Sequence, residues 1–260
     1  MKFHRLLRIK VVIATCALIL ASAISAPASA ASIGVNFEYQ ATWGSAANSL
    51  LPTDSAGLVA QQNWNNVANI GTGFGTTSGS VGGFQDSNGN ATGVSLNWNN
   101  VNNTFVGDAP WNIAPTSADE SLFYGVIEGM FSVGPSGPNL TVAGVGFALY
   151  DVIVYLADSP AGVTVDGSTL FYDPTIFSSV GYVAATSTSS SSTPIATYAM
   201  FSGLTSSSFN IDFQKLSGNR AAVAGFQIVE VATVPLPAAL PLFLVGLGGL
   251  GFASRRRKSA

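Results

Sequence analysis

VTVDGSTLFY, residues 163–172, contains the clearest secondary-structure signal in the sequence. Asp166 and Gly167 stand between two runs that are rich in β-branched and aromatic residues. Asp-Gly is one of the dipeptides that adopt the two positive φ angles of a tight hairpin turn. The stretch therefore predicts two antiparallel strands joined by a two-residue turn.

Further strands are predicted on both sides of this hairpin. Residues 140–158 form a long apolar run, which we expect to be two strands broken near Gly144–Gly146, or one strand with a bulge. Residues 33–39 and 94–98 alternate between apolar and polar or small residues, as half-buried strands do. YAMFSGL, SFNIDF and AVAGFQIVEV add three strands towards the C-terminal end. Only residues 55–70 leave room for a short helix.

Many short strands separated by Gly, Asn, Ser and Pro turns indicate an all-β fold, a single antiparallel β-sandwich of jelly-roll type. The low-complexity stretch STSSSST, residues 187–193, has strands on both sides. We interpret it as a long surface loop inside one domain rather than as a linker.

The order of IGVNF, LPTDSAGLVAQQNWNN, TGVSLNW, YDVIVYLAD, VDGSTLFY, YAMFSGL and AGFQIVEV resembles an uncharacterised family of secreted bacterial domains. Those domains are similar to galactose-binding-like or carbohydrate-binding modules. The resemblance extends over most of residues 32–231 and implies the fold more than the activity.

The first 30 residues have the pattern of a secretory signal peptide. Four cations precede an apolar run at residues 11–25, and Ala28-Ser29-Ala30 offers a small-x-small cleavage site. We expect export through the secretion translocon and cleavage by signal peptidase between Ala30 and Ala31, with cleavage after Ala26 or Ala23 as the alternative. The apolar run is short for a membrane anchor.

Residues 234–260 fall into three parts: a VPLPA motif, an apolar segment that ends at Ala253, and a basic cluster. Prolines near the start of the apolar segment leave only a marginal transmembrane helix. The basic cluster is expected to stay in the cytoplasm, which leaves the preceding domain outside. The motif consists of Val234, Pro235, Leu236, Pro237 and Ala238, and the basic cluster of Arg255, Arg256, Arg257 and Lys258.

This three-part tail resembles the PEP-CTERM class of bacterial sorting signals in its VPLPA variant, with Leu236 where the commoner version has Glu. The resemblance implies a membrane-embedded exosortase that recognises residues 234–238 and cleaves near them. It also implies a Gram-negative host that exports exopolysaccharide. An ordinary single-pass anchor is the alternative.

Between the signal peptide (1–30) and the sorting signal (234–260), the secreted domain (31–233) is strongly acidic. It keeps two cations, Lys215 and Arg220, against all 13 acids of the chain, which gives a net charge of −11. Binding of nucleic acid through phosphate neutralisation is therefore excluded.

The same domain contains neither histidine nor cysteine, because His4 and Cys16 both lie in the signal peptide. This excludes disulfides, zinc sites built on His or Cys, and Ser-His-Asp or Cys-His catalysis. Asp119, Glu120 and Glu128 are near one another in sequence, but their spacing does not indicate an acid–base pair. We expect no enzymatic activity and no cofactor.

The pentapeptide NWNNV occurs twice, at residues 63–67 and 97–101. The similarity ends with the five residues, so this is not a tandem repeat. One interpretation is a glycan-binding pair, in which exposed indole rings stack on sugars while amides bond hydroxyl groups. In the other, the tryptophans pack in the core, which alternation favours for Trp98, and the asparagines form turns. The glycan-binding candidates are Trp64, Asn65, Asn66, Trp98, Asn99 and Asn100, joined by the flanking amides Asn63 and Asn97, with Trp43 and Trp111 as further aromatic candidates.

DSNGN, residues 86–90, begins like a calcium loop. It has Ala91 where that loop has Gly and Asn97 where it has Glu. A tight turn at Asn88-Gly89 is the simpler interpretation. A structural calcium ion elsewhere on this acidic domain stays open.

The sequence thus predicts an inner-membrane precursor that an exosortase converts into a protein of the cell surface, outer envelope or extracellular matrix. The first hypothesis for its role is non-catalytic binding of exopolysaccharide or another neutral glycan. The second is a purely structural surface protein without a specific ligand. The third is a polysaccharide-active enzyme that works through carboxylates.

Overall fold

The computed structural model describes residues 30–39, 48–68, 70, 77–106, 114–129, 137–218 and 220–232. Ala30–Val231 form one compact unit. This unit contains two hydrophobic clusters, so it has a core of its own and can fold without the rest of the chain. Within the described ranges, no helix has the length and apolar character needed to cross a bilayer.

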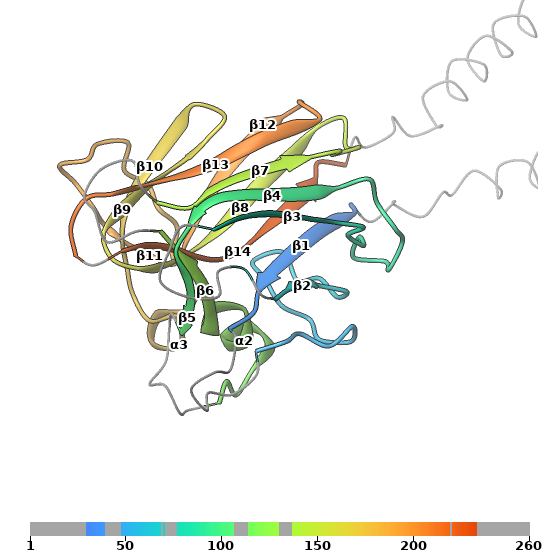
Figure 1. Cartoon of the computed structure of the whole chain (residues 1–260), viewed down its shortest axis with the longest axis horizontal. Coiled ribbons are helices and arrows are strands. Elements are labelled where there is room, and N and C mark those ends of the chain that lie inside the picture. Colours follow the sequence, from blue (N-terminus) through green and yellow to red (C-terminus); the bar gives the residue numbers. More distant parts are fainter. Residues whose placement is uncertain are drawn as a thin grey trace, which may run out of the picture. The chain divides into compact units, whose positions relative to one another are not determined.

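Two seven-stranded sheets pack face to face (Figure 1). The first sheet contains β1 (Ser32–Phe37), β2 (Asn65–Val67), β5 (Asn103–Val106), β6 (Gly125–Glu128), β8 (Tyr150–Asp158), β12 (Tyr198–Leu204) and β14 (Ala221–Glu230). The second sheet contains β3 (Thr77–Gly82), β4 (Ser95–Val101), β7 (Asn139–Ala143), β9 (Ala161–Val165), β10 (Ser168–Pro174), β11 (Ile195–Ala196) and β13 (Ser208–Lys215). The larger hydrophobic cluster draws residues from both sheets and fills the space between them.

The predicted β-sandwich is confirmed, and so is the hairpin at residues 163–172, which lies in the second sheet. β9 and β10 pair in antiparallel register, and the turn residues Asp166 and Gly167 have φ angles of 47° and 80°. The long apolar run is two strands, β7 and β8, which lie in different sheets. The sandwich is not wholly antiparallel as predicted, because β1–β2 and β10–β11 are parallel pairs.

The prediction of a half-buried first strand is wrong, because all six residues of β1 are buried. Ile33, Val35 and Phe37 face the core between the sheets. The opposite side of the strand is covered as well: a Cβ atom on Gly34 would lie 2.6 Å from the Trp64 ring. The alternation of apolar with polar or small residues predicted which side chains of β1 face the core, but it did not predict the layer that covers the other side of the strand.

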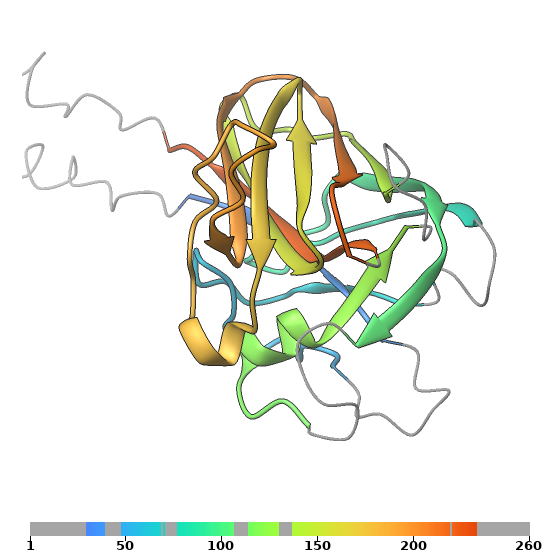
Figure 2. The same cartoon turned by 90° about the vertical axis from the view of Figure 1, so that its left-hand side faces the viewer.

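That layer covers the outer face of the first sheet. It consists of residues 48–64 and the short helices α2 (Ala118–Tyr124) and α3 (Phe177–Val180), which lie side by side in Figure 2. Phe123 of α2 stacks on Phe177 of α3 with ring centroids 4.4 Å apart, and it meets the edge of Tyr155 on β8 at 5.3 Å. This outer face is therefore occupied by the protein itself.

The helix expected within residues 55–70 is absent, and this prediction is wrong. Ala56 and Gln61 form an isolated bridge there, and β2 follows. The longer described helix is α2, which the sequence analysis missed. Ser117 caps α2 by accepting from the Glu120 amide at 3.1 Å, so the Ser-x-x-Glu pattern was the available signal.

The Ser/Thr-rich stretch at 187–193 is a loop inside the compact unit, between α3 and β11. The Phe171 amide donates to the Ser187 carbonyl at 2.8 Å, and the Asp173 amide donates to the Pro194 carbonyl at 2.9 Å. Both ends of the loop are thus tied to β10. The resemblance of this unit to a family of secreted bacterial domains stays a prediction.

Candidate functional site

The outer face of the second sheet carries polar side chains on neighbouring strands. The register aligns Asn99 of β4 with Asn139 of β7, Asp212 of β13, Thr164 of β9 and Thr169 of β10. A second row aligns Ser80 of β3, Asn97 of β4, Thr141 of β7 and Asn210 of β13. We call these nine residues the polar face.

Three side-chain pairs connect adjacent strands within the polar face. The Thr141 hydroxyl donates to the Asn210 amide oxygen at 2.8 Å, and the Thr164 and Thr169 hydroxyls lie 2.7 Å apart. Asn139 donates to the Asp212 carboxylate. Such pairs hold rotamers in place, so amide and hydroxyl groups are presented in a fixed arrangement rather than as independent flexible groups.

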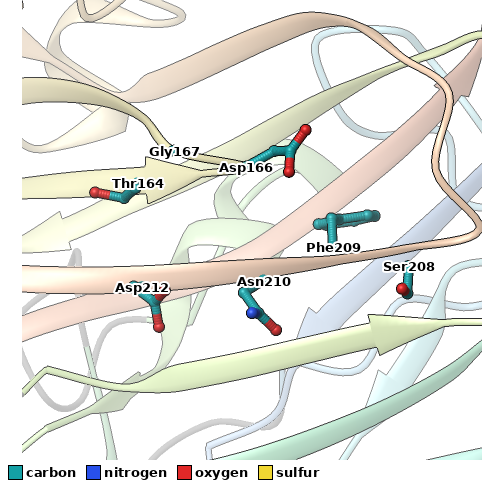
Figure 3. Close-up of a pocket in the computed structure, with 7 residues that line it drawn as sticks. All are labelled: Thr164, Asp166, Gly167, Ser208, Phe209, Asn210 and Asp212. Atoms are coloured by element: carbon teal, nitrogen blue, oxygen red, sulfur yellow. The ribbon is translucent and has the colours of Figure 1, made fainter.

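A cavity of about 250 Å³ opens at one end of the polar face (Figure 3). Ser208, Asn210 and Asp212 lie on one side of β13, and Phe209 points to the other side, towards the core. Partial burial raises the pKa of Asp212, while the hydrogen bond from Asn139 acts in the opposite direction. The remaining lining residues are Thr164, Asp166 and Gly167.

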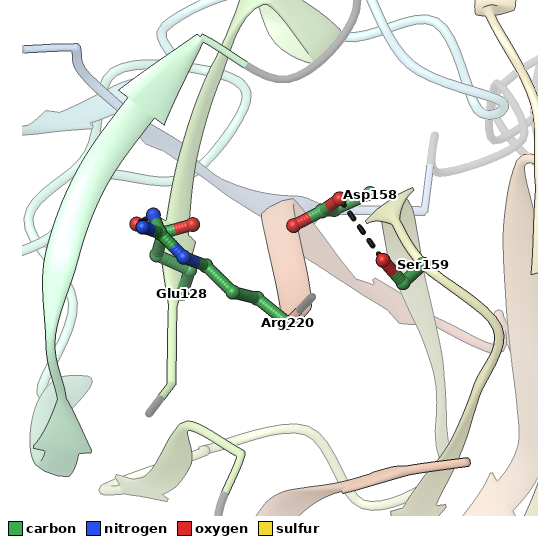
Figure 4. A network of polar contacts seen from close by, with 4 residues as sticks. All are labelled: Glu128, Asp158, Ser159 and Arg220. Carbon is green, nitrogen blue, oxygen red and sulfur yellow. Dashed lines mark hydrogen bonds and ion pairs between the residues drawn. The ribbon is translucent and has the colours of Figure 1, made fainter. Parts of the chain in front are cut away.

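Both cations of the described chain are kept away from exposed positions. Lys215 is 4% exposed. Arg220 forms an ion pair with Glu128, whose side chain is 1% exposed, and its guanidinium lies 5.6 Å from the centre of the Phe105 ring (Figure 4). The surface that the structure describes therefore presents carboxylates and neutral polar groups to solvent.

Asp158 is paired with Ala221, the residue after Arg220, and accepts from the Ser159 hydroxyl at 3.1 Å (Figure 4). Burial raises its pKa, while the Ser159 hydrogen bond and the charge of Lys215 lower it. Asp158 has a φ of 70°, the left-handed conformation, at the turn between β8 and β9. Glu128, one of the carboxylates considered for catalysis, is thus held in an ion pair with Arg220.

The first NWNNV copy has an architectural role. Trp64 is 6% exposed and its indole N–H donates to the Gln61 carbonyl at 3.1 Å, so its ring has no free face for a ligand. Asn65 binds the Gly34 carbonyl and both backbone groups of Gln85. Asn66 likewise binds both backbone groups of Leu50.

The second copy has a different role, because it lies on a regular strand. Trp98 packs partly buried against the core, where its ring fills the space above Gly79 on the neighbouring strand. Asn97 and Asn99 are exposed on the polar face. Asn100 has a φ of 60° and donates to the Gly137 carbonyl at 3.1 Å, which makes it a structural residue.

The remaining acidic candidates are engaged in local structure. Asp86 accepts from the amides of Asn88 and Asn90, each at 2.9 Å, as expected for a tight turn. Asp119 accepts from the Gly57 amide and the Tyr182 hydroxyl, and Glu120 accepts from Thr116. Within the described ranges no group of three or more His, Cys, Asp or Glu side chains could hold a metal ion.

Several predicted residues lie outside the described residues: Ala28 of the signal peptide, Trp43, Trp111, the motif at 234–238, and the basic cluster at 255–258. The polar face was itself missed, except for Asn97 and Asn99. The signal was present in NLTV and SFNIDFQ, where each polar residue falls in the phase opposite to the core residues.

The C-terminal region matches a protein-family model described as the PEP-CTERM protein-sorting motif, over residues 233–258. The chain carries a PEP-CTERM sorting signal. The resemblance inferred from the VPLPA motif, the apolar segment and the basic cluster is therefore confirmed. This signal implies export, a membrane-associated precursor and processing by an exosortase.

No curated protein matches the chain. One solved structure with which this chain aligns is the X-ray crystal structure of protein YXIM from Bacillus subtilis, at 11% sequence identity and a TM-score of 0.38. The alignment covers 79% of this chain and 41% of the YXIM chain. The chain thus spans less than half the length of that protein.

Proposed function

We propose that the secreted domain is a non-catalytic module of the cell surface or extracellular matrix that binds a neutral glycan through its polar face. Exosortase processing delivers the domain to the outside of the cell. There it meets exported polysaccharide, and the open side of the second sheet makes the contact.

The aligned rows of polar side chains, all neutral amides and hydroxyls except Asp212, are the observation that carries this proposal. Amides and hydroxyls both donate and accept hydrogen bonds, as sugar hydroxyls do. Strands lie about 4.8 Å apart, so a row across five strands extends over about 20 Å. This length suits several consecutive sugar units better than a single small molecule.

Charge favours a neutral polymer over an acidic one. The described surface carries carboxylates, and its two cations, Lys215 and Arg220, are buried or ion-paired. An anionic polysaccharide would be repelled at long range, whereas a neutral chain pays no such cost. We therefore expect polymers that carry uronic acids or phosphates not to bind.

The test uses residues 31–232 on columns of cellulose, dextran and the host's neutral exopolysaccharide. The variant Asn97→Ala/Thr141→Ala/Asn210→Ala removes three side chains from one row of the polar face. Retention on at least one neutral glycan, lost in this variant at an unchanged melting temperature, is the expected result.

The matched control removes three exposed polar side chains elsewhere, as Asn88→Ala/Ser190→Ala/Ser192→Ala. This control is expected to bind like the wild type. If the wild type is retained on none of the neutral glycans, the domain is a structural surface protein and the proposal fails.

A further inference from the structure

The first and last strands of the compact unit are direct neighbours. Ser32 of β1 is paired with Val229 of β14, and the Glu230 amide donates to the Ala31 carbonyl at 2.9 Å. The Val231 amide donates to the Leu149 carbonyl at 2.9 Å. The two ends of the folded unit are thus fixed side by side in one sheet.

A second contact joins these two ends through a side chain. The backbone nitrogen of Ala31 donates to Oε2 of Glu230 at 3.2 Å in a partly buried position. In the precursor this nitrogen belongs to the Ala30–Ala31 peptide bond and is neutral. It is also the atom that signal peptidase is predicted to release.

Hydrolysis of that bond by water leaves a carboxylate on Ala30 and an amino group on Ala31. The amino group takes up a proton at neutral pH, because the ordinary pKa of an α-amino group is about 7.7–8.0. We propose that the Glu230 carboxylate is the binding site for this new α-ammonium group, so that N-terminal processing creates an ion pair between the first and last strands.

The surroundings favour the charged form of the amine. Asp151 of β8 lies opposite Val229, and Asp86 precedes Ser87, whose amide donates to the Ser32 carbonyl. Tyr150 lies opposite Glu230, but its phenol hydroxyl donates to the Ser206 carbonyl and is neutral at pH 6.5, because burial raises its pKa. These titratable neighbours are all acids. The pKa of the amine is therefore expected to rise above its ordinary value, and the hydrogen bond to Glu230 becomes charge-assisted.

The ion pair has a consequence for the C-terminal end. Glu230 stands four positions before Val234, where the sorting motif begins. Removal of the signal peptide thus strengthens the contact between Ala31 and Glu230 at the end of β14, the strand that leads into the sorting segment. The exosortase then receives a substrate whose motif follows a firmly paired strand end.

The first step of the test is to export the full-length chain and determine the N-terminus of the product by mass spectrometry. Ala31 is expected, and any other N-terminus overturns the proposal. The second step compares residues 31–232 with residues 29–232, which retain Ser29 and Ala30. Both are made as wild type, as Glu230→Gln, and with Asp173→Asn as a charge-matched control.

At pH 6.5 the protein that starts at Ala31 is expected to melt about 1–3 °C above the extended one. An amine whose pKa is raised on folding stabilises the folded protein to the full extent below its unfolded pKa. This stabilisation is lost as pH rises through the folded pKa. The difference should therefore vanish at pH 10 and in Glu230→Gln, and persist in Asp173→Asn. Equal melting temperatures at pH 6.5, or a difference that survives Glu230→Gln, would overturn the proposal.

An NMR titration of the Ala31 amino group gives a direct readout. We expect its pKa to lie above 8 in the wild type and to fall in Glu230→Gln. A pKa that is the same in both proteins contradicts the ion pair.

Discussion

Replacement of Asn65 by alanine tests whether the two NWNNV copies have different roles. Its amide nitrogen donates to the carbonyls of Gly34 and Gln85, each at 2.9 Å, and its amide oxygen accepts from the Gln85 amide at 2.8 Å. Each bond contributes about 0.5–1.5 kcal/mol net. Because the bonds to Gln85 are exposed, we expect Asn65→Ala to cost about 2 kcal/mol.

Asn99 holds the same position in the second copy and provides the matched control. It lies exposed on a regular strand of the second sheet, so Asn99→Ala is expected to change stability by less than about 0.5 kcal/mol. For a domain of this size, the loss at Asn65 corresponds to a decrease in melting temperature of about 4–8 °C.

Urea unfolding of residues 31–232, followed by tryptophan fluorescence and circular dichroism, measures both variants. The midpoint should fall in Asn65→Ala with the slope unchanged, and stay near the wild-type value in Asn99→Ala. Equal midpoints for the two variants would refute the assignment of different roles to Asn65 and Asn99.

Three further predictions concern packing and charge. Gly34→Ala should lower the free energy of unfolding by about 1–3 kcal/mol, because the new Cβ atom would lie 2.6 Å from the Trp64 ring. A Cβ atom on Gly146 meets open space, so Gly146→Ala should leave the urea midpoint unchanged. Arg220→Ala should cost about 3 kcal/mol by leaving the buried Glu128 carboxylate without its cation, and adding Glu128→Gln should recover part of the lost melting temperature. Hydrogen bonds from the Thr116 hydroxyl and amide lower the pKa of Glu120. The Glu120 carboxylate therefore stabilises the folded protein above its unfolded pKa, and this stabilisation is lost as pH falls through its folded pKa. The stability difference between wild type and Glu120→Gln should therefore shrink between pH 6 and pH 3; a difference independent of pH contradicts this.

Local chemistry made much of the second sheet predictable. The Asp166-Gly167 turn fixed one hairpin, and the breaks at Gly144 and Gly146 separated β7 from β8. Both signals act within a few residues, so neighbouring sequence alone is sufficient to read them. The same holds for the sorting motif, whose three parts are contiguous.

Features that depend on distant partners were not predictable. β1 is buried on both sides because Trp64 and its loop cover it, and nothing within β1 indicates that cover. The identical residues of the two NWNNV copies gave no sign that one would bridge backbone groups and the other join a sheet. The polar face also depends on the register between strands that are far apart in sequence, such as β4 and β7.

The most direct test of the glycan-binding account is an NMR titration of ¹⁵N-labelled residues 31–232 with a soluble neutral oligosaccharide, cello-oligosaccharide or dextran oligomers. The account predicts that chemical-shift changes concentrate at Asn97, Thr141 and Asn210, and leave the buried Trp64 indole unchanged. Saturable changes centred on the covered outer layer of the first sheet, or no changes with any neutral oligosaccharide, would contradict it.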